Sequence, residues 1–270
     1  PSTAVELPLQ LLTHCPAHAA TPMIEAQALA DDLMIGELYV KDERTRMGLG
    51  SFKALGAAAV IADEAAQAAE GVPDSATLKG RTYVTASAGN HGISVAAGAA
   101  IFGANAIIYL AETVPAGFAD RLRAKGADVR IEGADYEASM AAAMVCAESE
   151  GATLLSDSSW DGYLALPHKL MEGYTVMAAE AAEQIDEAPT HIMLQAGVGG
   201  LAVAVAAYSR KVWGDAPQIV VVEPDAAPAL QAAIEAGKFV TTSGPVSNMG
   251  RLDCKAATLI YGSVMPGTYR

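Results

Sequence analysis

Short apolar runs alternate with longer alanine-rich stretches along most of the chain. The apolar runs have the length and β-branched content of strands, and they cover residues 37–41, 82–86, 106–110, 153–156, 191–195 and 218–223. The stretches between them predict helices over residues 53–69, 91–102, 116–124, 136–149, 168–184 and 201–212. Residues 219–222 are apolar on both faces, which is typical of a parallel strand covered by helices on both sides. We therefore predict a doubly wound α/β fold with mostly parallel, twisted sheets.

Residues 70–80 interrupt this alternation. They contain Gly71, Pro73 and Gly80 and have little apolar periodicity, which indicates a surface connection. A chain of 270 residues is long enough for one large domain or two smaller lobes, and this connection could lead into a second lobe.

Composition narrows the class of protein. With 52% hydrophobic and 18% charged residues, the chain is expected to be globular rather than disordered. No apolar run approaches the roughly 20 residues of a membrane-spanning helix, and the first residues, with Glu6, do not resemble a secretory signal. Without a spanning run we expect no membrane as a partner, and because the net charge of −14 would repel a phosphate backbone we expect no nucleic acid.

The three cysteines, Cys15, Cys146 and Cys254, are odd in number and do not have the spacing of a metal site. We therefore expect no disulfide framework and no bound metal, and a reducing cytoplasmic setting.

Lys53 follows Gly48 and Gly50 and precedes good helix formers, so it is predicted to lie in the first turn of a helix. The dipole at that helix end disfavours an extra positive charge, and this would favour a neutral amine able to attack an aldehyde. The alternative is a solvated surface lysine, which is the usual role of this residue type. Its mostly apolar neighbours favour the functional interpretation.

A second candidate is the predicted turn at Ser87, Ala88, Gly89, Asn90 and His91, between a strand and a helix. Free N–H groups at such a turn can hold a carboxylate. The alternative is an ordinary helix start with Ser87 or Asn90 as its N-cap, and His91 is expected to be a structural histidine.

A third candidate is the glycine-rich turn at Gly197, Val198, Gly199, Gly200 and Leu201, which follows a predicted strand and opens a helix. Its glycines would let the backbone approach a phosphate closely at the helix N-terminus. It matches neither the dinucleotide nor the nucleotide P-loop pattern, and glycines can also serve only to form the turn.

Together these elements resemble the fold type II pyridoxal-phosphate enzymes, the tryptophan synthase β and threonine dehydratase-like superfamily, and most of all the diaminopropionate ammonia-lyases. The resemblance runs in order from about Tyr39 to Asp225. It rests on VKDE at residues 40–43, GLGSFKALG at 48–56, DSSWDGY at 157–163, LQAGVGGL at 194–201 and VEPD at 222–225.

The resemblance implies a pyridoxal 5′-phosphate cofactor and a two-lobed fold, with residues 1–80 and 157–270 as a large cofactor-binding lobe and 81–156 as a small mobile lobe. It makes Lys53 the Schiff-base lysine, preceded by Phe52, and the base that removes the Cα proton. Asn90 would contact the phenolic oxygen of the cofactor. Residues 197–201 would form the phosphate cup, and residues 87–91 would hold the substrate carboxylate.

The implied activity is an ammonia-lyase reaction, an α,β-elimination that converts a small amino acid into a 2-keto acid and ammonia; diaminopropionate, serine and threonine are candidate substrates. A homodimer is expected. Asp157 matches an active-site aspartate that could contact a β-amino group, although a capping role is an alternative. Ala88 stands where diaminopropionate ammonia-lyases have an aspartate that serves D-substrates, so we expect elimination from L-amino acids only.

The chain ends at Arg270, and the C-terminal part of the family fold is therefore expected to be shortened. Family members place a Ser, Thr or Cys against the pyridine nitrogen in that part. Cys254 lies too early to match it and is interpreted as a buried or incidental thiol. Two alternatives stay open at this point: a catalytically impaired family member that binds cofactor or amino acid without turnover, and a β-replacement enzyme that consumes a second nucleophile.

Overall fold

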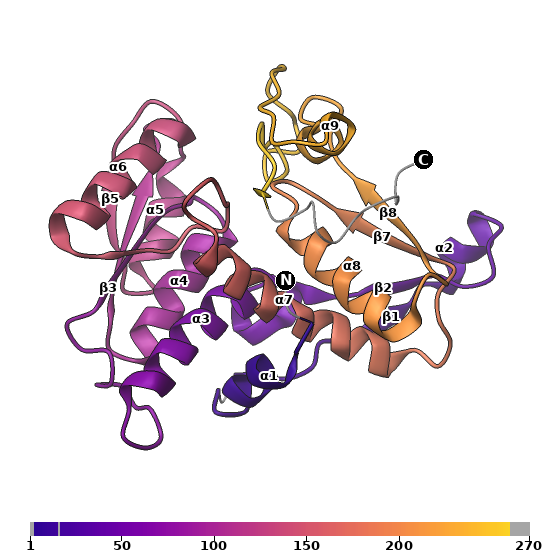
Figure 1. Ribbon diagram of the computed structural model, residues 1–270, viewed down its shortest axis with the longest axis horizontal. Coiled ribbons are helices and arrows are strands. Elements are labelled where there is room, and N and C mark those ends of the chain that lie inside the picture. Colours follow the sequence, from indigo (N-terminus) through magenta and orange to yellow (C-terminus); the bar gives the residue numbers. More distant parts are fainter. Residues whose placement is uncertain (1–2, 16, 260–270) are drawn as a thin grey trace.

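The computed structural model describes residues 3–15 and 17–259, and it has two lobes that each contain a parallel sheet (Figure 1). The helices are α1 (Glu6–Thr13), α2 (Gln27–Asp32), α3 (Lys53–Ala68), α4 (Asn90–Ile101), α5 (Ala116–Arg123), α6 (Tyr136–Glu150), α7 (Ala165–Gln184), α8 (Gly200–Trp213) and α9 (Ala229–Ala236), with a 3₁₀ segment η1 (Glu43–Gly48). The strands are β1 (Met23–Glu25), β2 (Tyr39–Lys41), β3 (Thr82–Ala86), β4 (Asn105–Leu110), β5 (Asp128–Ile131), β6 (Thr153–Leu154), β7 (His191–Gln195) and β8 (Gln218–Val222).

One lobe is built on a four-stranded parallel sheet in the order β5-β4-β3-β6. Successive residues of each strand point to opposite faces, so Tyr83 and Ile108 pack in the core shared with α4 and α5. Val84 and Ile107 pack in a separate core under α6. This is the helix-covered parallel sheet expected from strands that are apolar on both faces.

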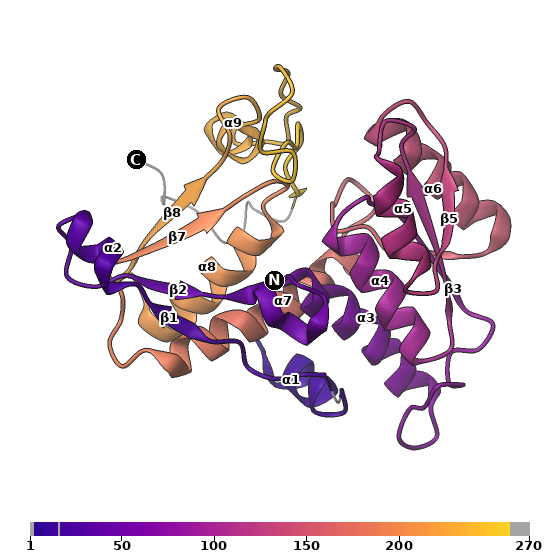
Figure 2. The same cartoon turned by 180° about the vertical axis from the view of Figure 1, so that it is seen from behind.

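The other lobe contains the parallel pair β7 and β8 and the antiparallel pair β1 and β2, with α7 and α8 packed together (Figure 2). The α8 helix is almost entirely buried from Gly200 to Ala207 and supplies much of the core of this lobe. The predicted α/β architecture is therefore confirmed.

Helix α3 takes part in both cores, because Leu55 packs in the core with α8 while Ile61 and Ala65 pack in the core with β3. It crosses α7 closely, since a side-chain carbon at Gly173 would collide with the backbone carbonyl of Leu55. The division of the chain at residues 80 and 157, and the mobility of the lobe between them, stay predictions. The expectations about the C-terminal end at Arg270 lie outside the described residues.

All the predicted helices are present, but two predicted strands are shorter than expected. The run at 37–41 forms only β2, and that at 153–156 forms only β6, because β6 pairs with Tyr83 and Val84 and the chain then leaves the sheet. Within the described ranges, no helix is long and apolar enough to cross a membrane.

Candidate active site

Lys53 is the first residue of α3, and a tightly bent segment of backbone leads into it. Met47, Gly48 and Gly50 all have positive φ, at 51°, 67° and 81°. A left-handed conformation is costly for a methionine, so neighbouring contacts must stabilise the bend. They come from Arg46, whose fully buried guanidinium donates to Glu43 and to Glu180 on α7 at 2.7 Å each.

The amine of Lys53 is paired with Asp157, with 2.5 Å between Nζ and Oδ2. The two side chains keep only 23% and 19% of their exposure, so solvent screens the pair weakly. Burial opposes the charge on each group. The attraction between them outweighs it, holding the pKa of Lys53 above its usual range and that of Asp157 below. The expectation of a neutral amine is therefore wrong for this structure, because the partner carboxylate counteracts the helix dipole.

Two aromatic rings flank the amine. Its Nζ lies 5.4 Å from the ring centre of Phe52 and 5.6 Å from that of Tyr174, and the two rings meet edge to face at 5.1 Å. The hydroxyl of Tyr174 is buried and has no hydrogen-bond partner among the described residues. Burial raises the pKa of Tyr174 to about 12, so this hydroxyl keeps its proton at neutral pH.

The loop between β3 and α4, residues 87–91, comes back toward the start of α3, because Ser94 Oγ donates to the carbonyl of Lys53 at 2.8 Å. The N-cap of α4 is Gly89, without a side-chain cap, so the alternative with Ser87 or Asn90 as N-cap is wrong. The N–H groups of Asn90 and His91 donate to no acceptor in the described part of the chain. They are available to an anion.

His91 itself is held away from the loop surface. Its ring is 3% exposed, and Nε2 lies 2.7 Å from the carbonyl oxygen of Leu155. Burial lowers the pKa of His91 and favours the neutral ring. These contacts agree with the structural histidine expected from the sequence. The side chain of Asn90, in contrast, is exposed.

The loop between β7 and α8, residues 197–201, is the second concentration of free donors. Gly199 has a φ of 96°, which a glycine adopts without strain, and α8 begins at the next residue. No acceptor among the described residues receives the N–H groups of this loop, which belong to Gly197, Val198, Gly199, Gly200 and Leu201. Five consecutive free donors at a helix N-terminus are suited to bind a phosphate.

The sequence interpretation missed the segment of residues 249–259, which lies across this loop. Thr258 donates its N–H to the carbonyl of Val198 at 2.7 Å and shares a 2.5 Å hydroxyl contact with Ser159. A side-chain carbon at Gly197 would lie 3.0 Å from Sγ of Cys254. The thiol of Cys254 is thus adjacent to the glycine loop, and burial raises its pKa to about 11.

Lys53, Phe52, Asp157 and the glycine loop are thus brought together with two residues that no sequence pattern indicated, Tyr174 and Cys254. Neither Tyr174 nor Cys254 belongs to a local motif, since each reaches the site through packing of segments distant in sequence. Within residues 3–15 and 17–259, no group of three His, Cys, Asp or Glu side chains could hold a metal ion.

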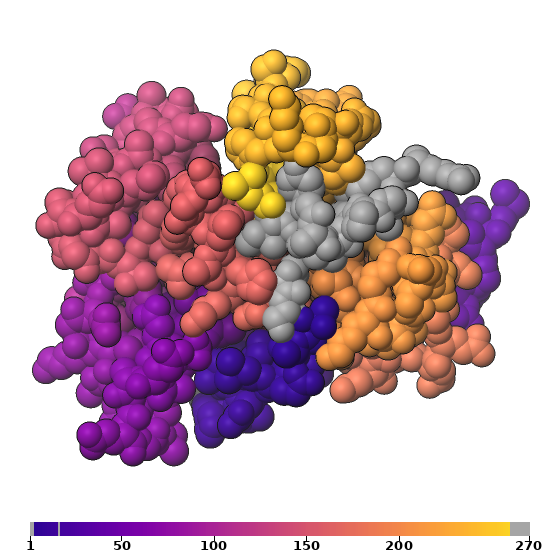
Figure 3. All heavy atoms as spheres, in the orientation of Figure 1, coloured from indigo at the N-terminus to yellow at the C-terminus, as the bar shows by residue number. Residues whose placement is uncertain are grey.

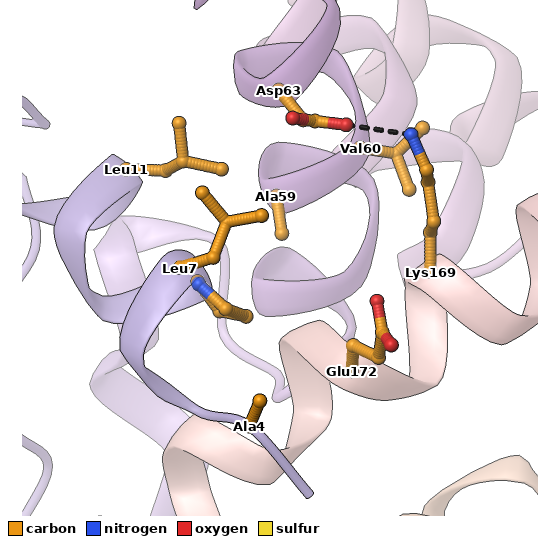
Figure 4. Close-up of a pocket in the computed structure, with 9 residues that line it drawn as sticks. Ala4, Leu7, Leu11, Ala59, Val60, Asp63, Lys169 and Glu172 are labelled. Carbon is orange, nitrogen blue, oxygen red and sulfur yellow. Dashed lines mark hydrogen bonds and ion pairs between the residues drawn. The ribbon is translucent and has the colours of Figure 1, made fainter. Parts of the chain in front are cut away.

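A separate hollow lies between α1, α3 and α7 (Figure 4). Its lining is mostly aliphatic, with Leu7 and Leu11 on α1 facing Val60 on α3, and its ion pair joins Asp63 to Lys169 at 2.6 Å. The paired amine and the free backbone donors lie at the other site, around Lys53.

Comparison with known proteins agrees with this geometry. Residues 15–264 match the family model described as "Pyridoxal-phosphate dependent enzyme". A diaminopropionate ammonia-lyase of Salmonella typhimurium is 33% identical over 265 residues, which cover 91% of this chain and 66% of the relative. The mouse L-serine dehydratase/L-threonine deaminase is 30% identical over 225 residues, with 83% and 63% covered.

Among solved structures, the diaminopropionate ammonia-lyase of Escherichia coli in complex with D-serine superposes with a TM-score of 0.86 at 28% identity. That match covers 97% of this chain and 69% of the other. Of the two curated relatives above, the matched region spans less than two thirds of the length, 66% and 63%. The resemblance expected from the motifs is confirmed, and the chain belongs to the family of pyridoxal-phosphate dependent enzymes.

Proposed function

We propose that this chain carries the active site of an ammonia-lyase that eliminates the β-substituent of a small L-amino acid. The observation that supports the proposal most directly is the pairing of Lys53 with Asp157 at 2.5 Å, near a loop of free backbone donors. An amine, a carboxylate and an anion site are the groups that such a reaction requires.

The residues present fit pyridoxal phosphate. The five free N–H groups of the glycine loop would hold the phosphate, and a side-chain carbon at Gly197 would make a tight contact of 3.0 Å with Sγ of Cys254 in the segment that covers the loop. The amine of Lys53 would tether the carbonyl carbon. The side chain of Asn90 is exposed, as its expected contact with the phenolic oxygen requires. When bound, the cofactor withdraws electrons from the Cα atom of an attached amino acid.

Lys53 has two roles in this proposal. Its amine would hold the cofactor as a tether, and the same amine, when free and neutral, would accept the Cα proton of the substrate. That step turns the amine into an ammonium. Asp157, 2.5 Å away in this structure, would stabilise the ammonium as the proton arrives. The substituent on Cβ would leave with the electrons of its bond.

Within residues 87–91, the free N–H groups of Asn90 and His91 would hold the carboxylate of the substrate. The candidate substrates are diaminopropionate, serine and threonine, because relatives that act on them match this chain. Asp157 would also attract a β-ammonium group, which favours diaminopropionate. Elimination from diaminopropionate followed by hydrolysis gives pyruvate and two molecules of ammonia, one from each amino group. The homodimer and the cytoplasmic setting stay predictions.

The test is release of a 2-keto acid from purified, pyridoxal-phosphate-loaded protein. We expect turnover of one or more of L-diaminopropionate, L-serine, L-threonine and L-3-hydroxyaspartate, with one keto acid formed for each substrate consumed. K53A should lose both the visible absorption of the tethered cofactor and turnover. K169A is the control: it removes a lysine of α7 that pairs with Asp63 of α3, and it should keep both the absorption and turnover. Protein that binds the cofactor but turns over none of the four substrates would contradict the proposal.

A further inference from the structure

Arg251 lies where the segment of residues 249–259 meets the other lobe. Its guanidinium carbon is 4.8 Å from the ring centre of Phe118 on α5. A side-chain carbon at Gly89 would lie 3.1 Å from Nη1 of Arg251 and 3.7 Å from its Cζ. The guanidinium therefore lies over the ring of Phe118 on α5 and against Gly89 in the loop of residues 87–91. Both belong to the lobe that holds β3. Figure 3 shows the described end of the chain, in yellow, reaching toward that lobe.

The charge of Arg251 has no carboxylate partner in the described ranges. Asp253, two residues further along the chain, is already bound, because it pairs with Lys255 at 2.6 Å and accepts the N–H of Ser247 at 3.1 Å. Arg251 is exposed, so its guanidinium is accessible to an anion from solution. Its five donors match a planar anion such as a carboxylate.

The surroundings of Arg251 also favour an anion. It rests against Gly89, the N-cap of α4, where the free N–H groups of Asn90 and His91 carry partial positive charge. A guanidinium at that end of a helix is repelled unless an anion lies between them. Asp157 cannot serve as that anion, because it is bound to Lys53.

We propose that Arg251 binds the α-carboxylate of the amino-acid substrate, opposite the free N–H groups of Asn90 and His91. This inference rests on the function proposed above and adds to it a residue from a distant segment. The carboxylate would then be held from both lobes at once, with Arg251 at one side and the start of α4 at the other. The consequence is selectivity: an amino acid whose carboxylate is replaced by an uncharged amide loses both sets of contacts.

The experiment measures binding rather than turnover. Loaded protein is titrated with L-alanine, which has no β-leaving group, and with L-alaninamide, which lacks the carboxylate. Binding is followed by the visible absorption of the cofactor and independently by the shift in Tm. We expect R251M, which replaces the guanidinium with an uncharged end on an unbranched side chain, to weaken L-alanine binding by at least about tenfold and L-alaninamide binding by less than about twofold. R251K keeps the positive charge but not the planar guanidinium with its five donors, so its affinity for L-alanine should lie between those of R251M and the wild type.

R121A is the matched control. Arg121 lies 6.0 Å from the same Phe118 ring, so this variant removes one positive charge from the same aromatic residue without changing the contact at Gly89. It should bind L-alanine as the wild type does. Equal L-alanine affinity in R251M and wild type would overturn the inference and leave the proposed function intact. L-aspartate, which carries a second carboxylate, is titrated in the same way. If R251M lost affinity for L-aspartate alone, the α-carboxylate assignment would be overturned. A loaded wild type that binds no amino acid would overturn the proposed function and this inference together.

Discussion

Nζ of Lys53 and Oδ2 of Asp157 lie 2.5 Å apart, although 104 residues separate them in the chain. The pair stabilises the charged amine, whereas reaction with the cofactor aldehyde requires the neutral amine. Loading of the cofactor should therefore depend on pH through this pair. We expect D157N to lower the pKa of Lys53 and shift the midpoint of loading to lower pH, followed by the visible absorption of bound pyridoxal phosphate.

The control is D161N, which removes an exposed carboxylate from the same loop and should leave the midpoint of loading unchanged.

The pair of Lys53 and Asp157 also predicts how the stability of cofactor-free protein responds to pH. The pKa of Asp157 is below the usual 3.8, so its stabilisation is present above pH 3.8 and lost as the pH falls further. The pKa of Lys53 is above the usual 10.5, so its contribution is present below pH 10.5 and lost as the pH rises further. A D157N midpoint equal to that of the wild type would contradict the first expectation.

Ala88 predicts the stereochemistry of the reaction. Its methyl group cannot transfer a proton, which leaves Lys53 as the base and one face of the substrate open to deprotonation. We expect wild-type protein to process the L-form of a substrate at least about 100-fold faster than the D-form, since a positioned base contributes about 10² to 10⁴ in rate. Keto-acid release from each pure enantiomer measures this. A88D should gain activity on the D-form, while A88N, of similar size but without a base, should not; comparable wild-type rates on both forms would refute the prediction.

The sheet strands were predictable because their pattern is local. Residues 82–86 and 191–195 form β3 and β7 as predicted, since an apolar run between turn residues suffices to define a buried strand. The edge strand β5 was missed, because Asp128 and Arg130 alternate with apolar residues over only four positions. The helices α1, α2 and α9 were also missed; α2 has only six residues, which provide little periodicity, whereas α1 and α9 are as long as the predicted α5.

The site was predictable only in part. Lys53 and the glycine loop have local patterns, namely glycines before a helix and a strand-to-helix turn. Lys53 was wrongly expected to be neutral. That expectation considered only the helix dipole, whereas the charge is stabilised by Asp157, which comes from a loop after β6. Arg251 and Cys254 reach the site through the path of residues 249–259 across the glycine loop, and their sequence has no period or motif that indicates this path.

Arg46 should be essential for stability. Its guanidinium is fully buried between Glu43 and Glu180, so R46A removes the buried charge that pairs with both carboxylates and leaves Glu180 paired with Lys41 alone. We expect a loss of about 3 to 5 kcal/mol in the free energy of unfolding, measured by urea denaturation of cofactor-free protein. R44A is the control. Arg44 is 83% exposed and paired with Asp42, and its removal should cost at most about 1 kcal/mol. Equal losses in the two variants would show that the buried cluster does not stabilise the bend before Lys53.

Gly173 sets the distance between α7 and α3, the helix that begins with Lys53. A side-chain carbon there would collide with the carbonyl of Leu55 and lie 3.1 Å from Cβ of Ala59. G173A should therefore destabilise the protein by about 1 to 3 kcal/mol and reduce turnover by displacing α3. G117A is the control. A side-chain carbon at Gly117, in the first turn of α5, has no neighbouring atom within 4 Å, so G117A should leave the stability of the protein unchanged or raise it. Thermal unfolding and keto-acid assays on both variants test this, and an undisturbed G173A would contradict the close crossing.

Tyr174 and Tyr83 provide opposite tests of a buried hydroxyl. That of Tyr174 has no partner in the described part of the chain, whereas that of Tyr83 donates to Glu64 at 2.6 Å. A buried hydroxyl without a hydrogen bond costs about 1 to 3 kcal/mol, so Y174F should stabilise cofactor-free protein by about 1 kcal/mol. Y83F should destabilise it, because Glu64 loses its donor. Urea denaturation of the two variants gives both values. If Y174F instead lost as much stability as Y83F, the hydroxyl beside Lys53 would have to be bonded within the folded chain.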